Sequence, residues 1–534
     1  MTRKNTTDDA NLTRRGFLAT ATAAAAAYAT FGSAAGQLDG GRSPLVRAGD
    51  WPLQLRWDVP DDAVIMREGW PSWIIETDED RSDALEEWRD REDEFSIVRE
   101  AHVDDWHAAL VASPAGVIQS LANQSWVQSV DLDIDVDLIE PVVPTSAGGL
   151  GLADLSRRES FSFRFEGLLG EAASMGDLDT GVAYRDDMEP ADLDDVRDIV
   201  NALATADAET IDLTAVVIDT GVTADSIFED AEEETRILDA STDFTDSDRP
   251  TVGEQGLDTV RDRQGHGNWV AAAMAGDGNT TGYAPTADIL ALKALDDDGS
   301  GSAFDIAEAI RYAADEVGDD GVACLSLGSP IYSYTLDQAV AYAAGAGMPC
   351  VVAAGNDRDV SRWVNSPADS PEAITVTATT AEDADEARSA AFHNTDPDSG
   401  SRNFSAGYTQ GSHIDLTAPG CAIDVETPTG MQRLTGTSMA APQVAGGIMQ
   451  LLAEDSSPQG DIDELRERLT EYAQPVPKAG VTEAGAGMLD IQAAIDEDEP
   501  DETQAQARDD DAQARDLAHE QLSNGEGGFL FGLL

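Results

Sequence analysis

The sequence has very little positive charge. Its 534 residues include 33 lysines and arginines against 103 aspartates and glutamates, which gives a formal net charge of −70, and only Lys4, Lys293 and Lys478 are lysines. Nucleic-acid binding needs the opposite sign of charge, so this balance argues against nucleic acid as a partner. The acidic residues are spread along the whole chain. That distribution is typical of a surface that stays soluble in concentrated salt, where repulsion is screened, and we expect a halophilic source.

Cysteine is also scarce. The chain has three, Cys324, Cys350 and Cys421, so at least one thiol is free or pairs between chains. Cys324 and Cys350 lie in apolar runs typical of buried strands, where cysteine behaves as a small hydrophobic residue. Because no spacing resembles a metal site, we expect all three to be structural.

The N-terminal residues lack an apolar run strong enough to predict a membrane span. Arg14 and Arg15 precede an alanine-rich stretch that ends near Ser33-Ala34-Ala35. This pattern is similar to a twin-arginine export signal, predicted for residues 1–35; a basic amphipathic helix is the weaker alternative. We therefore expect a protein that is exported already folded and secreted, with no stable membrane span.

Residues 36–145 predict a small α+β domain. Its expected elements are strands at Ser72–Glu76, Phe95–Val98 and Ala109–Val111 and helices at Asp83–Arg89 and Pro114–Ala122. The run Val130–Leu138 alternates apolar and acidic residues, which predicts one half-buried strand with a wet acidic face. An inhibitory leader segment and an independent binding module are both compatible with this pattern.

The following residues, 146–207, are a linker or an atypical N-terminal extension, with an aromatic cluster at Phe161, Phe163 and Phe165. From residue 208 to 496, short apolar runs alternate with helical patterns, which predicts a doubly wound, mostly parallel α/β sheet with helices on both faces. Residues 497–534 are rich in acidic residues, Gln and Ala and predict a disordered acidic tail with an apolar end. The expected strands of the sheet are Leu213–Ile218, Ile289–Leu292, Val322–Leu327, Pro349–Ala353 and Ala373–Val376, and the expected helices are His266–Ala275, Phe304–Glu316 and Leu336–Gly345.

Ser438 is a candidate nucleophile. Gly436 and Thr437 permit a tight turn before it, and an apolar helix follows. The free N–H groups of a helix start suit negative charge that develops beside a serine. Pro442 is expected near the first turn, where a missing N–H is tolerated. An ordinary start of a helix with small residues would look the same, so the chemistry depends on partners elsewhere.

Three other segments supply such partners. Asp219 ends a predicted buried strand, where sites form in open α/β sheets, and it could orient a histidine. His266 begins an apolar helix between two glycines, the setting best suited to a general base among the six histidines. Asn356 ends another buried strand, where its amide could donate to an oxyanion together with the Ser438 backbone N–H. Taken singly, each is also a common turn or helix-start residue.

The order Asp219, His266, Ser438 is that of the subtilisin triad. The region from Leu213 to Ile495 resembles the subtilisin-like serine proteases (subtilases), particularly secreted halophilic members of the halolysin kind. Gly436–Pro442 matches the family's serine motif fully, whereas Asn268 stands where the family usually has threonine. Further similar segments are Gly282–Pro285, Leu292–Leu295, Ser326–Gly328, Phe404-Ser405, Asp415–Gly420 and Gly485–Gly487.

The resemblance implies a serine endopeptidase that acts on protein or peptide substrates through an acyl-enzyme. In it, Asp219, His266 and Ser438 are catalytic and Asn356 completes the oxyanion hole. It further implies that the domain at 36–145 is a propeptide that inhibits its own chain. The implied substrate-binding residues are Ser326, Leu327, Gly328, Ala353, Ala354 and Gly355.

Two expectations stay open at this point. The chemistry requires no cofactor, and structural calcium is common in the family, but residues 276–281 lack its longer calcium loop and we name no metal ligands. Asp357, next to Asn356, could favour basic side chains in the specificity pocket.

Two other functions also remain. One is a processing protease or acyl-transferase dedicated to a single protein partner. The other is a catalytically silent binding or scaffold protein, against which the complete set of catalytic residues argues.

Overall fold

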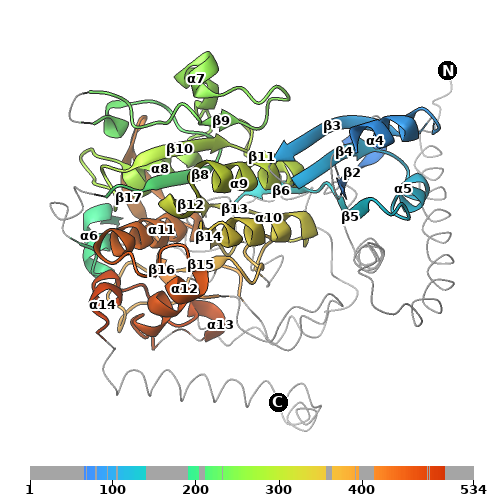
Figure 1. Cartoon of the computed structure of the whole chain (residues 1–534). Coiled ribbons are helices and arrows are strands. Elements are labelled where there is room, and N and C mark those ends of the chain that lie inside the picture. Colours follow the sequence, from blue (N-terminus) through green and yellow to red (C-terminus); the bar gives the residue numbers. More distant parts are fainter. Residues whose placement is uncertain are drawn as a thin grey trace, which may run out of the picture.

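The computed structural model describes residues 65–139 and 190–498, apart from short gaps at 68, 78–80, 93, 104–105, 204–210, 231–232, 357–363, 391, 396–413, 478 and 480. An N-terminal unit (residues 65–134) packs on a larger α/β body (residues 190–498), and the chain from 135 to 139 runs onto the body (Figure 1). The predicted export signal, the cluster at Phe161–Phe165 and all of the predicted tail beyond 498 lie outside the described residues. No helix of the described residues is long and apolar enough to cross a membrane.

The body is built on a parallel sheet of seven strands, in the order β16-β15-β14-β12-β8-β10-β9. Its early strands lie at the centre and at one edge and its late strands at the other, so the chain winds in both directions from the centre. This architecture confirms the predicted fold class. The strands are β8 (Thr214–Asp219), β9 (Thr242–Asp243), β10 (Asp288–Lys293), β12 (Gly321–Leu325), β14 (Cys350–Ala353), β15 (Ile374–Thr379) and β16 (Leu416–Pro419).

Side chains of strand β8, in the interior of the sheet, alternate between two apolar layers, as the period of two in a strand requires. Ala215 and Val217 face α8 (His266–Ala275) and α11 (Thr437–Glu454), whereas Val216 and Ile218 face α9 (Ala303–Val317) and α10 (Tyr334–Gly345) (Figure 1). Because both faces are covered, the strand is apolar from Ala215 to Ile218. Further described elements of the body are α6 (Leu193–Ile199), α7 (Val252–Gln255), α12 (Ile462–Glu471), α13 (Val481–Ala484), α14 (Ile491–Asp496), β7 (Ala191–Asp192), β17 (Ile423–Thr427) and β18 (Gly430–Leu434).

Most predicted elements of the body form within two residues of their expected bounds. The expected strand Val322–Leu327 instead ends at Leu325, and a separate two-residue strand, β13 (Leu327–Gly328), follows it. Strand β16 was not predicted, because it has four residues and ends in a proline. The three cysteines are buried and unpaired, in agreement with a structural role.

The N-terminal unit is an antiparallel sheet with two helices, α4 (Ser82–Arg89) and α5 (Ala115–Leu121). It contacts the body through aromatic and cationic side chains. The Trp106 and Phe304 rings lie 5.7 Å apart, and the Arg311 guanidinium lies 5.0 Å from the Trp106 ring. Cation–π pairs of this kind are worth about 0.5–2 kcal/mol each. The strands are β1 (Met66–Arg67), β2 (Trp70–Thr77), β3 (Ser96–Val103), β4 (Trp106–Ala112) and β5 (Val127–Leu132).

The single half-buried strand expected at Val130–Leu138 is wrong. The chain breaks after β5, and β6 (Asp135–Leu138) pairs with the body instead. The acidic face is not wet at this point, since Asp131 is 7% exposed and Asp133 is fully buried. Each carboxylate accepts hydrogen bonds at the start of a body helix, which replaces the solvent that burial removes.

Asp131 and Asp133 bind two different helices. Asp131 Oδ2 accepts from Ser333 Oγ and from the Thr335 N–H, both at 3.0 Å, at the start of α10. Asp133 Oδ1 accepts from the Phe304 N–H at 3.3 Å, at the start of α9. The two helices that cover one face of the sheet are therefore capped by the N-terminal unit.

We expect Asp133 to make stability depend on pH. Burial raises its pKa from 3.8 to about 6, although Arg67 and Arg99 oppose the shift. The folded state then holds more protons than the unfolded state between about pH 4 and pH 6, so the free energy of unfolding falls as pH rises through this window. Asp133→Asn keeps an acceptor for Phe304 but cannot ionise.

Denaturant unfolding of both full-length proteins in concentrated salt measures this effect. The variant's stability relative to wild type should rise by about 1–3 kcal/mol between pH 4 and pH 7. A difference that stays constant across this range would contradict the assignment.

Candidate active site

Asp219 and His266 form a buried pair at the carboxyl edge of the sheet. Asp219 is the last residue of β8 and His266 the first of α8. His266 Nδ1 lies 2.9 Å from both carboxylate oxygens of Asp219, and neither residue is more than 2% exposed. A carboxylate on Nδ1 makes this nitrogen the donor, so the geometry turns Nε2 into the basic atom.

A second buried carboxylate, Asp262, holds the helix that carries His266. Its Oδ1 accepts from the Gln264 and Gly265 N–H groups at 2.9 and 2.7 Å, and its Oδ2 accepts from the Asn268 N–H at 2.8 Å. Thr220 Oγ1 lies 3.0 Å from Asp262 and 3.2 Å from Asp219. Burial raises the pKa of Asp262, and its backbone donors counteract that shift. The sequence analysis did not single out this residue.

Asn268 also fixes this helix. Its Oδ1 accepts from the Thr223 N–H at 2.7 Å, and its Nδ2 donates to Thr223 Oγ1 at 3.3 Å. The amide thereby ties α8 to the loop that follows β8. The polar residue at the position where the family usually has threonine thus has a structural role in this chain.

Ser438 is the second residue of α11 and is fully buried. Pro442 lies in the helix interior, beyond the first turn, which corrects the expected position. A proline at 442 cannot donate to the carbonyl four residues earlier, which is that of Ser438. Ser326 Oγ donates to this carbonyl at 3.3 Å instead. The proline is tolerated because a side chain replaces the missing donor.

Asn356, just beyond β14, is oriented by Thr437, the neighbour of Ser438. The Thr437 N–H and its Oγ1 lie 2.9 and 3.0 Å from Asn356 Oδ1. With its oxygen engaged in this way, the amide can present only its Nδ2 as a donor elsewhere. A Cβ at Gly436 would lie 2.6 Å from that Nδ2, so glycine leaves the space that the amide occupies.

A segment of the same chain lies across Ser438. Strand β6 pairs antiparallel with β11 (Ser300–Ser302) on one side and with β13 on the other. The next residue, Ile139, donates its N–H to the Ser326 carbonyl at 3.1 Å, and its own carbonyl accepts from Ser438 Oγ at 3.0 Å. An extended peptide carbonyl is therefore held against the serine hydroxyl.

The predicted binding residues are only partly engaged by this segment. Ser326, Leu327 and Gly328 pair with it. Ala354 and Gly355 instead bond to the body, for example from the Gly355 N–H to Thr437 Oγ1 at 3.3 Å. Ala353 lies in β14 and is buried. Strand β11 was missed by the sequence analysis, and its only sequence signal is the run of small residues at 299–302.

Asp357, considered above for the specificity pocket, lies outside the described residues. So does His413, one of the histidines in a polar loop-like context. His393 is fully buried, with its Nε2 2.8 Å from Ser389 Oγ and its Nδ1 2.8 Å from the Asn394 carbonyl. Both ring nitrogens are therefore engaged in the interior.

Residues 276–282, where the family's longer calcium loop is missing, do not fit a calcium site. No group of three or more His, Cys, Asp or Glu side chains among the described residues could hold a metal ion. At residues 276–282 the Gly282 N–H bonds to the Gly276 carbonyl at 2.8 Å, and the Arg197 guanidinium donates to the Thr281 and Gly282 carbonyls. An arginine thus occupies carbonyl groups that could otherwise face a cation, and no step of the chemistry is assigned to a metal.

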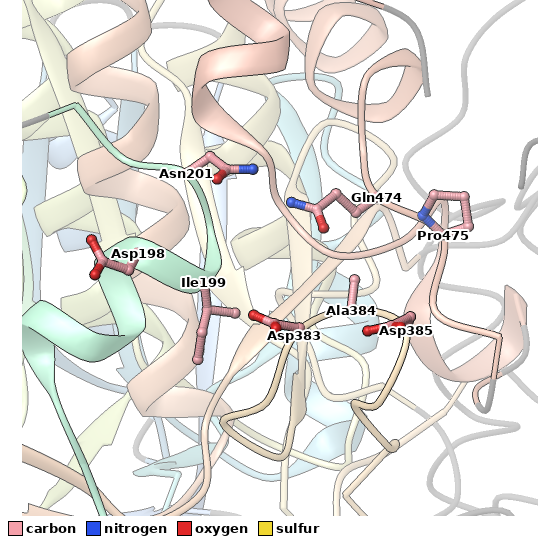
Figure 2. Close-up of a pocket in the computed structure, with 8 residues that line it drawn as sticks. All are labelled: Asp198, Ile199, Asn201, Asp383, Ala384, Asp385, Gln474 and Pro475. Carbon is pink, nitrogen blue, oxygen red and sulfur yellow. The ribbon is translucent and has the colours of Figure 1, made fainter. Parts of the chain in front are cut away.

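Figure 2 shows a hollow that contains none of the predicted site residues. It lies between the end of α6, the turn at 383–385 and the segment at 474–475. Its lining is mixed amide, carboxylate and apolar, formed by Asp198, Ile199, Asn201, Asp383, Ala384, Asp385, Gln474 and Pro475.

Comparison with known proteins identifies the family. The sequence model described as "Subtilase family" matches residues 178–503, more than half of the chain. The chain therefore belongs to the subtilase family.

Individual relatives agree with this result. A thermophilic serine proteinase of Bacillus sp. (strain AK1) is 35% identical over 260 residues, which cover 46% of this chain and 58% of the relative. Subtilisin Savinase of Lederbergia lenta is 33% identical over 246 residues, which cover 45% of this chain and 80% of the relative. The chain thus spans little more than half the length of the Bacillus proteinase.

The crystal structure of fervidolysin from Fervidobacterium pennivorans, described as a keratinolytic enzyme related to subtilisin, has the same fold. Its TM-score with this chain is 0.55 at 21% identity, covering 83% of this chain and 64% of that chain.

Replacing Asp262 by alanine should destabilise the protein by at least about 2 kcal/mol, because it leaves several buried N–H groups without an acceptor. Asp258→Ala is the matched control, since Asp258 is exposed and only takes part in surface ion pairs; its loss should be below about 1 kcal/mol. Denaturant unfolding in concentrated salt compares the two, and equal losses would contradict a capping role for Asp262.

Proposed function

We propose that this chain is a serine endopeptidase made as a precursor, whose own propeptide occupies the active site through residues 135–139. The observation that supports this best is the 3.0 Å contact from Ser438 Oγ to the Ile139 carbonyl, at the end of a strand paired on both sides with the body. A substrate in this position would have its scissile carbonyl next to the nucleophile, which is the requirement for attack.

The proposed mechanism assigns one role to each of these groups. Ser438 Oγ attacks the carbonyl carbon of Ile139, and its proton passes to His266 Nε2. Asp219 stabilises the imidazolium through Nδ1–H. The Asn356 amide and the Ser438 N–H donate to the oxyanion. The bond between Ile139 and Glu140 then breaks, and His266 gives the proton to the leaving amine of Glu140.

Water completes the reaction. His266 takes a proton from a water molecule, whose oxygen attacks the acyl-enzyme, and returns the proton to Ser438 Oγ. The products are a carboxylate at Ile139 and a new N-terminus at Glu140. The segment up to Ile139 keeps its strand pairing and its caps on α9 and α10 after the cut, so it would remain as an inhibitor until it dissociates or is digested.

Two features of the sequence support secretion and activity in concentrated salt. The twin-arginine pattern at 1–35 supports export of the folded chain, and the net charge of −70 supports work in concentrated salt. Once the segment up to Ile139 has dissociated or been digested, the expected substrates are proteins or peptides outside the cell. Structural calcium remains an expectation without assigned ligands.

Expression of the precursor in high salt tests self-processing. Wild type should yield a chain that begins at Glu140 and is labelled at Ser438 by a serine-directed phosphonate, whereas Ser438→Ala should keep the bond after Ile139 intact. Peptide mass mapping locates the new terminus. An unlabelled wild type with an uncut bond and no casein hydrolysis would reject the enzyme.

The oxyanion role of Asn356 has its own test. Asn356→Ala should lower kcat on a peptide anilide by about 100- to 1,000-fold, the loss measured when a subtilisin is deprived of such a donor, with little change in KM. Thr437→Val should cause a smaller loss because it removes one of the two hydrogen bonds that orient the amide, and Thr437→Ser, which keeps the hydroxyl, should retain activity. An unchanged kcat in Asn356→Ala would remove this residue from the mechanism.

A further inference from the structure

The side chains of strand β6 divide into two sets. Val136 and Leu138 are buried against the body, whereas Asp135 and Asp137 are half-exposed. Buried aliphatic residues follow from any apolar groove. An acidic residue on the open side is unexpected, because the loop before β11 carries three consecutive aspartates, Asp296–Asp298, that would repel it.

Asp137 has a specific partner in the body. Ser300 Oγ donates to its Oδ1 at 2.6 Å, a short bond of the kind formed by a charged acceptor. The backbones of the two residues pair in the same ladder, Ser300 opposite Asp137. Hydroxyl and carboxylate are therefore held together by the strand pairing that binds the peptide.

The nearby aspartates are partly neutralised. Asp297 lies 3.1 Å from Lys293 Nζ and 3.7 Å from Arg263. Asp296 Oδ1 accepts from the Ser300 and Asp298 N–H groups at 3.1 and 2.9 Å, so it is committed to fixing the turn that presents Ser300. At about 1 M salt or more, screening within roughly 3 Å removes most of the remaining repulsion, whereas a direct hydrogen bond persists.

We propose that Ser300 is a specificity-determining residue that favours substrates with aspartate two positions before the residue whose carbonyl is attacked. The proposal rests on the endopeptidase function above and names a class of substrate for it, acidic peptides with the pattern of residues 136–139, Val-Asp-Leu-Ile. The selectivity comes from one charge-assisted hydrogen bond at a half-exposed position. Such a bond should change kcat/KM by about 5- to 10-fold.

The test compares two synthetic substrates in concentrated salt, acetyl-Val-Asp-Leu-Ile-p-nitroanilide and the same peptide with alanine in place of aspartate. For the processed wild-type enzyme, kcat/KM should be about 5- to 10-fold higher for the aspartate peptide. Ser300→Ala should reduce this ratio to near one, and Ser300→Thr, which keeps the hydroxyl, should retain most of it. A wild-type ratio of one, or a ratio that Ser300→Ala leaves unchanged, would overturn the proposal.

The precursor provides a second measurement that does not depend on the folding of a Ser300 variant. Asp137→Ala should slow the appearance of the new N-terminus at Glu140 several-fold at high salt, and Asp135→Ala, on the same open side of β6, should not. Equal rates for the two variants would count against Ser300. Failure of the proposed function is distinct, because wild type would then cleave neither peptide and would not label with the phosphonate.

Discussion

Buried carboxylates at the starts of helices hold the parts of this protein together. Asp262 caps the helix that carries His266, while Asp131 and Asp133 cap the two helices on the opposite face of the sheet. Removing a carboxylate from water is costly unless donors replace the solvent, and the first N–H groups of a helix are such donors. In this chain, which has 103 acidic residues, carboxylates thus also connect separate structural elements.

The same interaction links the N-terminal unit to the candidate active site. Asp131 and Asp133 place β5 against α9 and α10, and the chain then runs directly into β6, between β11 and β13. The position of Ile139 at Ser438 thus depends on Asp131 and Asp133, a few residues earlier in the chain, which bind the starts of α9 and α10. Contacts made by Asp131 and Asp133, away from Ser438, thus help to position the Ile139 carbonyl beside its hydroxyl.

The parallel sheet and the residues at its edge were predictable because their signals are local. Asp219, His266 and Asn356 each stand where a buried strand ends or an apolar helix begins, and such boundaries can be identified from a few residues. The role of Asp133 could not be predicted, because an alternating acidic strand looks the same whether its acids face water or helix N-termini. Strand β11 has three small residues and is defined by its pairing with β6. Its own sequence has no hydrophobic pattern that would predict a strand.

Pro442 has a consequence for how precisely the segment at Ser438 is aligned. Without its N–H, the carbonyl of Ser438 is available to Ser326, whose own carbonyl binds the peptide N–H of Ile139. Ser326 therefore contacts both the backbone of Ser438 and the backbone of Ile139. Ser326 thus fixes the register of the peptide relative to Ser438. A peptide shifted by one residue along β13 would direct its N–H away from the Ser326 carbonyl and lose this hydrogen bond.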